Sequence, residues 1–169
     1  MEVVIGFTLG AVFFMQGCEY FGLSQPKTTG VVGVIGAIVL ASLAIWKPLA
    51  ALANVPMEAL AATSVLLAIY AALVAAVGLW DSDSRGLGLY SAFAGVIALV
   101  GAIYMLVTGT VLLPVLCQAI TAVAFGMVFF YVGLPSKGLR VATAWVLVIA
   151  GAADVVLHFL AIMRAPGLV

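Results

Sequence analysis

The side chains best suited to chemistry lie in the last long apolar run of the sequence, AWVLVIAGAADVVLHFLAIM, which contains Asp154 and His158. Four positions separate the two, so on a helix they share one face, one turn apart. His158 is the single histidine of the chain. One histidine and one carboxylate are too few for a catalytic metal site, which takes three protein ligands. Because no nucleophile–base–acid set or phosphate loop accompanies them, we expect no enzyme, no metal site and no cofactor.

Asp154 is costly wherever the run crosses a membrane. It lies about 15 residues into the run, or about 22 Å along a helix, past the midplane. Ionisable groups inside a span usually face the bundle interior or water, which favours a role in a pore. The alternative is a hydrated carboxylate near the outer interface, paired with His158. Both interpretations stay open.

Other polar and aromatic residues offer weaker signals. Glu19 lies close to the end of the first apolar run and indicates an interfacial group more than a pore carboxylate. Tyr70 lies mid-span, where its hydroxyl can serve a solute or a neighbouring helix. Leu9, Phe13 and Gln16 recur at helical spacing, a stripe that is typical of packing and also compatible with a pore lining.

The elements that carry these residues are apolar almost throughout. Hydrophobic residues make up 67% of the 169, against roughly 45–50% in a soluble domain. Six basic and six acidic residues could not cover a soluble globule, so the composition predicts an integral membrane protein. The zero net charge leaves no basic face for nucleic acid. The start, Met-Glu without a basic region, predicts a retained helix rather than a cleaved signal peptide.

Six apolar runs are long enough to cross a bilayer, which takes about 20 residues per helix. The expected helices cover approximately residues 3–21, 29–46, 57–79, 86–107, 111–132 and 139–163. Two further breaks between these runs, at residues 47–58 and at Thr108–Thr110, are less polar than the other turns. The pattern is continuous, so we expect one transmembrane domain over residues 1–169, all-α, in contact with the lipid bilayer.

The basic residues indicate an orientation. The turns after the first, third and fifth helices contain four basic residues, Lys27, Arg85, Lys137 and Arg140. The opposite side contains two, Lys47 and Arg164. Basic residues favour the cytoplasmic side, so both termini are expected outside.

A repeat organises the turns. Gly22, Gly78 and Gly133 each precede a leucine and a polar turn with a base, and they are spaced 56 and 55 residues apart. Glycine at a helix end can take the left-handed cap conformation, and the next leucine can pack back on the last turn. Three hairpins entering from one side predict parallel repeats around a central pore. The alternative is that any helical hairpin needs a glycine turn and a base.

Several motifs resemble those of the AmiS/UreI amide/urea channel family, in the same order over essentially the whole chain. They are Gly10, the Gln16-Gly17 pair, GLSQPK at 22–27, IYAA at 69–72, the GL-x-D…R…YSxF run from Gly78 to Phe93, and Trp145 followed by Gly151. The resemblance implies a six-helix inner-membrane channel of three hairpins, with periplasmic termini and a homo-hexameric assembly. It also implies a small neutral solute, urea or a short-chain amide, and a functional link to a cytoplasmic amidase or urease.

The resemblance places residues of the first, third and fifth helices on the pore wall. Carried over by position, they are Gly6, Leu9, Phe13, Tyr70, Ala119, Ala122 and Val123. The fifth helix lacks the tryptophans of acid-gated urea channels, and Ala150 stands where those channels carry a carboxylate. Asp154, one turn on, is a candidate substitute. The 47–58 loop contains no histidine, so we expect a channel without acid gating. The small side chains on the fifth helix favour a pore shaped for an amide bulkier than urea.

Two other functions remain open. One is a proton-coupled carrier of small solutes that uses Asp154. The other is a membrane subunit that scaffolds a larger complex and transports nothing. The repeat favours transport, because a scaffold has no need of an axial path.

Overall fold

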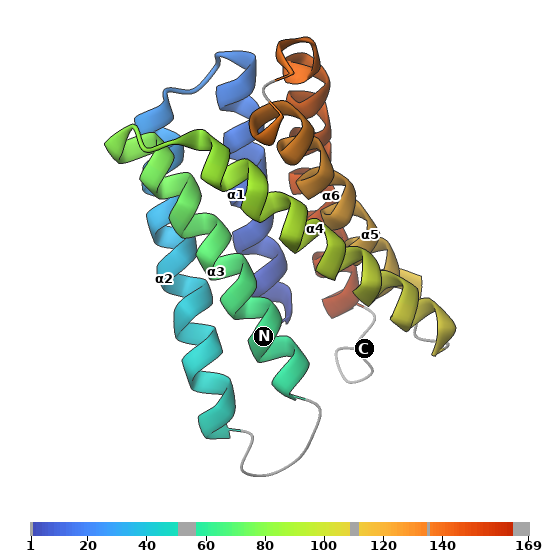
Figure 1. The fold of residues 1–169 in the computed structure, drawn as a ribbon. Helices are drawn as coiled ribbons and strands as arrows, with labels where there is room; N and C mark the ends of the chain where they lie inside the picture. Colours follow the sequence, from blue (N-terminus) through green and yellow to red (C-terminus); the bar gives the residue numbers. More distant parts are fainter. Residues whose placement is uncertain (1, 51–56, 109–111, 135, 164–169) are drawn as a thin grey trace.

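The computed structural model describes residues 2–50, 57–108, 112–134 and 136–163, and the regular secondary structure within them is helical (Figure 1). The six long helices are α1 (Glu2–Phe21), α2 (Pro26–Ala50), α3 (Met57–Trp80), α4 (Ser84–Val107), α5 (Leu112–Val128) and α6 (Arg140–Met163). A π-helical turn, η2 (Phe129–Gly133), extends α5, and a short 3-10 turn, η3 (Lys137–Leu139), precedes α6. Each of the six spans is long and apolar enough to cross a membrane. The expected all-α fold with six membrane-crossing helices is confirmed.

The helix ends differ from the apolar runs at several places. α2 starts with Pro26 at its first position, where the missing N–H is no loss, and continues to Ala50. It therefore extends beyond residue 46 through Lys47, Pro48, Leu49 and Ala50, although Pro48 has no N–H to donate within the helix. Within the expected 47–58 break, residues 51–56 lie outside the described residues. α4 ends at Val107 with Thr108 as its cap, and 109–111 likewise lie outside them.

One of the three Gly-Leu turns has the expected cap. Gly22 has a φ of 81°, and two backbone bonds close a Schellman motif, Gly22 N–H to Glu19 O and Leu23 N–H to Cys18 O, both 2.8 Å. Leu23 does not pack back on the helix, since it is 80% exposed. The expectation is wrong for Gly78, which is helical; the left-handed residue at that turn is Asp81, with a φ of 50°.

The third turn also departs from the expectation. Gly133 ends the π-helical turn η2, and among the described residues it is not one of those with positive φ. Gly78 and Gly133 instead lie where two helices touch. Gly78 packs against Gly30, and Gly133 against Gly88. A Cβ at Gly78 would collide with the backbone of Gly30, and a Cβ at Gly88 would collide with the backbone of Gly133. The repeated glycines therefore allow close helix packing more than they end helices.

The closest packing crosses from one expected hairpin to the next. The most extensively packed pairs are α1 with α6, α2 with α3, and α4 with α5. Each pair meets at glycines: Gly10 with Gly151, Gly30 with Gly78, and Gly88 with Gly133. Small residues let the backbones approach, which is how membrane helices gain contact without a hydrophobic driving force. The bundle is therefore built from three tight pairs.

The ends and the outer face of the bundle fit a membrane-crossing arrangement. α1 begins and α6 ends at one end of the bundle, and the turns that follow α1, α3 and α5 lie at the other (Figure 1). Large apolar side chains stay exposed on the outside, above all on α4, where Phe93, Val96 and Val100 are examples. In a bilayer, these side chains face hydrocarbon rather than water.

Candidate solute pathway

Three aromatic rings meet in the middle of the bundle. Phe13 of α1, Tyr70 of α3 and Phe125 of α5 are fully buried, and each comes from a different helix pair. Their centroids lie 5.7 Å (Phe13–Tyr70), 5.3 Å (Phe13–Phe125) and 4.8 Å (Tyr70–Phe125) apart, all in edge-on geometry. Such contacts are the favoured aromatic arrangement. We call these three residues the aromatic cluster; it closes the centre of the chain.

A primary amide of the protein lies directly beside the aromatic cluster. The Tyr70 hydroxyl donates to Oε1 of Gln16 at 2.5 Å, and Nε2 of Gln16 donates to the Tyr20 hydroxyl at 2.9 Å. Gln16 is buried, so water does not compete strongly for these bonds. The side-chain carboxamide is thus held by one phenol at its carbonyl and by another at its NH2 group.

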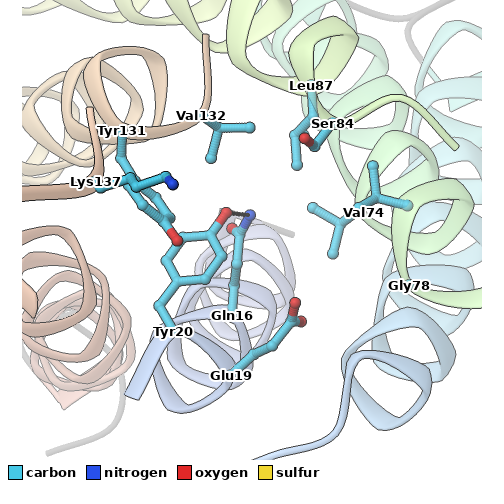
Figure 2. Close-up of a pocket in the computed structure, with 11 residues that line it drawn as sticks. Gln16, Glu19, Tyr20, Val74, Gly78, Ser84, Leu87, Tyr131, Val132 and Lys137 are labelled. Carbon is cyan, nitrogen blue, oxygen red and sulfur yellow. Dashed lines mark hydrogen bonds between the residues drawn. The ribbon is translucent and has the colours of Figure 1, made fainter. Parts of the chain in front are cut away.

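A cavity of about 290 Å³ begins at this amide and opens toward the polar turns (Figure 2). We call it the vestibule. Its walls come from α1, α3, α4, η2 and η3: Gln16, Glu19, Tyr20, Val74, Val77, Gly78, Ser84, Leu87, Tyr131, Val132 and Lys137. Gln16 lies between the vestibule and the aromatic cluster. A solute that enters from this end meets Gln16 before it meets the three rings.

The vestibule is held in shape by contacts among distant segments. The Tyr20 and Tyr131 rings meet edge-on with centroids 4.9 Å apart. Arg140, at the start of α6, donates from Nε to the Tyr20 carbonyl at 2.8 Å. Tyr131 belongs to the π-helical turn, a distortion that is frequent at functional sites. Phenols, an amide and a hydroxyl offer hydrogen bonds here, while Glu19 and Lys137 supply the charged groups of the lining.

The opposite half of the interior holds the buried acid. Asp154 is 1% exposed, and both its carboxylate oxygens lack a hydrogen-bond partner among the described residues. Nδ1 of His158 lies 2.7 Å from the carbonyl oxygen of Asp154, so the carboxylate itself is not paired with the imidazole. The Asp154–His158 pairing, which belonged to one of the two interpretations, is therefore not formed by the carboxylate, and the imidazole bonds to the Asp154 backbone carbonyl instead. Within this single chain the Asp154 side chain faces the interior of the bundle.

Comparison with known proteins identifies the family. The model of the family described as AmiS/UreI family transporter matches residues 1–163. The chain belongs to the AmiS/UreI family. Family membership makes the protein a transporter and agrees with the expectation that it is not an enzyme. No curated protein sequence matches the chain.

The fold of this AmiS/UreI transporter is also seen in a solved structure. The cryo-EM structure of the Helicobacter pylori urea channel in its closed state aligns with a TM-score of 0.76 over 96% of this chain and 98% of that one. The aligned residues are 17% identical. At 17% identity the structural similarity shows a shared fold, and it does not assign roles to individual residues.

The residues expected on the pore wall lie at different places in the transporter. Phe13 and Tyr70 meet in the aromatic cluster, and Leu9 belongs to the same buried core. Gly6 lies against the His158 ring. Ala119 and Ala122 are half-buried on α5. Val123 is 57% exposed, so within one chain it faces outward rather than toward the aromatic cluster.

Sequence reasoning missed Phe125, although the repeat contained it. Tyr70 lies eight residues before Gly78, and Phe125 lies eight residues before Gly133. Phe13 precedes Gly22 by nine. Applying the repeat to Tyr70 would have pointed to Phe125. Tyr20 and Tyr131 had no such signal, because a tyrosine near a helix end is typical of the membrane interface.

Proposed function

We propose that this transporter is a channel through which small neutral amides, such as urea and short-chain aliphatic amides, diffuse passively. The observation that carries the proposal is the Gln16 carboxamide, held between the hydroxyls of Tyr70 and Tyr20. A primary amide solute presents the same pair of groups, a carbonyl that accepts and an NH2 that donates. Such a solute can accept from the Tyr70 hydroxyl with its carbonyl and donate from its NH2 group to Oε1 of Gln16. The buried polar groups then stay paired, and leaving one unpaired would be costly.

The next step along the path is the aromatic cluster. Its three rings fill the centre, so a solute crosses only when Phe13, Tyr70 or Phe125 turns aside. Each edge-on aromatic contact stabilises the closed arrangement by about 0.5–1.5 kcal/mol beyond the burial of its area. Losing one such contact when a ring rotates is a cost that thermal side-chain motion can meet. A flat, neutral amide is thin enough to pass between two of these rings once one has rotated. An ion would lose its hydration there with no charged group in exchange, because Gln16 and the three aromatic side chains are neutral.

Swelling of proteoliposomes tests the proposal. The purified protein is reconstituted, and the vesicles are mixed with an inward gradient of urea or acetamide in a stopped-flow instrument. We expect light scattering to relax faster than in empty vesicles, with no uptake of Na⁺ or Cl⁻. Permeability equal to that of the lipid alone would reject the channel and favour the scaffold subunit instead.

A proton-coupled carrier is the second candidate, and it is favoured by the Asp154 carboxylate, which has no hydrogen-bond partner among the described residues. A buried acid that takes up and releases a proton is a common element of carriers. Addition of a protonophore separates the two functions. Amide entry that follows the solute gradient and is unchanged by the protonophore supports the channel; entry that collapses supports the carrier.

The setting of the channel is proposed on the resemblance and on the charge pattern. We infer that it lies in the bacterial inner membrane as a homo-hexamer of single-domain subunits, with the vestibule toward the cytoplasm and both termini periplasmic. Lys137 and Arg140 lie at the vestibule end and support that orientation. A cytoplasmic amidase or urease would consume the solute. Mass measurement of the solubilised complex and labelling of terminal cysteines from each side test assembly and orientation.

A further inference from the structure

A second group of chemically active side chains lies in the half of the interior away from the vestibule. Cys117 of α5 is brought beside Asp154 and His158 of α6, and one potential ligand atom from each lies within 4.8 Å of the others. Cys117 lies eight residues before Phe125, or about 12 Å along α5 from the aromatic cluster. The sequence spacing already placed Asp154 next to His158, and the fold brings Cys117 to the same place.

The Asp154 carboxylate lacks the partners that a buried charge needs. Both of its oxygens are without a hydrogen bond in the described part of the chain, although the side chain is almost completely buried. An isolated carboxylate in a medium of low polarity is strongly unfavourable, and a paired or metal-bound one is not. The lone pairs of both oxygens can therefore bind a cation or accept a hydrogen bond.

The hydrogen bond of His158 favours the tautomer that many metal-binding histidines have. A carbonyl oxygen can only accept, so the contact of Nδ1 with the Asp154 carbonyl at 2.7 Å places the ring proton on Nδ1. Nε2 then keeps its lone pair. A ring nitrogen that donates to a backbone carbonyl while the other binds metal is a recurrent pattern. Gly6 leaves the space for the ring, because a side chain there would collide with the imidazole.

We propose that Cys117, Asp154 and His158 form a binding site for a soft divalent cation of the zinc class. Thiolate, imidazole and carboxylate together are the ligand set of zinc, and three protein ligands leave a fourth position for water. A thiolate and a carboxylate also cancel the two positive charges, so the occupied site is neutral, as the apolar surroundings require. Zinc bonds of about 2.0–2.3 Å in tetrahedral geometry hold the ligand atoms about 3.3–3.8 Å apart, so metal binding requires side-chain rotations that bring the three atoms closer than their present limit of 4.8 Å.

Cobalt substitution tests the site directly, without any transport measurement. The purified protein, free of affinity tag and kept reduced, is titrated with Co²⁺ in detergent. We expect one equivalent to produce a thiolate-to-cobalt charge-transfer band and the visible bands of four-coordinate cobalt. One equivalent of Zn²⁺ should remove both. Because no solute is involved, the result is independent of the proposed channel function.

Substitutions assign the ligands. Cys117→Ser should abolish the charge-transfer band, and Asp154→Asn and His158→Gln should each weaken binding at least about tenfold. Cys18→Ser is the matched control, since Cys18 lies on α1 outside this group and is also a free, half-buried thiol. Cys117→Ala serves as a second thiol variant, and elution volume and helical content confirm folding. Absence of the band in the unaltered protein, its loss in Cys18→Ser, or its persistence in both Cys117 variants would overturn the proposal.

Discussion

The hydroxyl of Tyr70 donates a 2.5 Å hydrogen bond to Oε1 of Gln16, across 54 residues of sequence. This bond joins the aromatic cluster to the vestibule, because Tyr70 belongs to the first and Gln16 lines the second. A solute amide that replaces Gln16 at Tyr70 is already in contact with the rings that it must displace. Recognition and opening therefore share one residue.

Removal of the Tyr70 hydroxyl should slow amide flux. In Tyr70→Phe the ring stays in the aromatic cluster, while the solute and Gln16 both lose a donor. One hydrogen bond contributes about 1 kcal/mol, so we expect urea and acetamide permeability to fall about fivefold. Stopped-flow swelling at matched protein content measures it.

Tyr90→Phe is the matched control for that change. The Tyr90 hydroxyl donates to the Leu66 carbonyl at 2.8 Å, away from the vestibule lining. We expect flux in this variant to equal that of the unaltered protein. Equal losses in the two variants would mean that the Tyr70 hydroxyl supports the fold rather than the solute.

Truncation of Phe125 should open the centre and widen the choice of solute. Phe125→Ala removes one of three mutually contacting rings, so larger amides such as butyramide should gain more in permeability than urea. The same change deletes a buried ring, which costs about 3–5 kcal/mol of stability, so Phe125→Leu is measured beside it. Phe93→Ala, an exposed ring on α4, is the control. An unchanged ratio of butyramide to urea flux in both Phe125 variants would contradict a gate at this ring.

The helices and the family could be read from the sequence, but the packing pairs could not. Apolar runs of about 20 residues mark spans whatever their neighbours are. They do not show which face meets which helix, because a membrane helix is apolar on its lipid face as well as inside. Gly78 illustrates the difficulty. Its position before a leucine and a polar turn indicated a helix cap, whereas its contact is with Gly30 of the neighbouring helix.

The site was predictable where it followed the repeat or the resemblance. Phe13 and Tyr70 were expected together, and the eight-residue offset from the repeated glycine leads on to Phe125. The proximity of Cys117 to Asp154 follows no repeat and no local spacing. It depends on how α5 and α6 rotate against each other, which a run of apolar residues does not encode.

The α1–α6 contact should tolerate no added side chain. A Cβ at Gly10 would lie 2.7 Å from the Gly151 carbonyl oxygen, too close without moving the helix backbone. We expect Gly10→Ala to lower the thermal unfolding midpoint in detergent. Gly126→Ala is the control, because a Cβ there meets no atom within 4 Å. Alanine is the better helix former by about 1 kcal/mol, so that variant should be unchanged or more stable. A Gly10→Ala midpoint at or above that of Gly126→Ala would contradict the tight pair.

Occupancy of the Cys117–Asp154–His158 site should slow amide flux. The site lies in the interior beyond the aromatic cluster, where a bound cation and its water take up space and hold α5 and α6 together. With Zn²⁺ inside and outside the vesicles, we expect permeability to fall and to recover on chelation. Cys117→Ser should keep its flux in Zn²⁺, while Cys18→Ser should remain sensitive. Inhibition that persists in Cys117→Ser would place the effect of zinc elsewhere. Full flux in the unaltered protein at cobalt-verified occupancy would place the solute path away from this site.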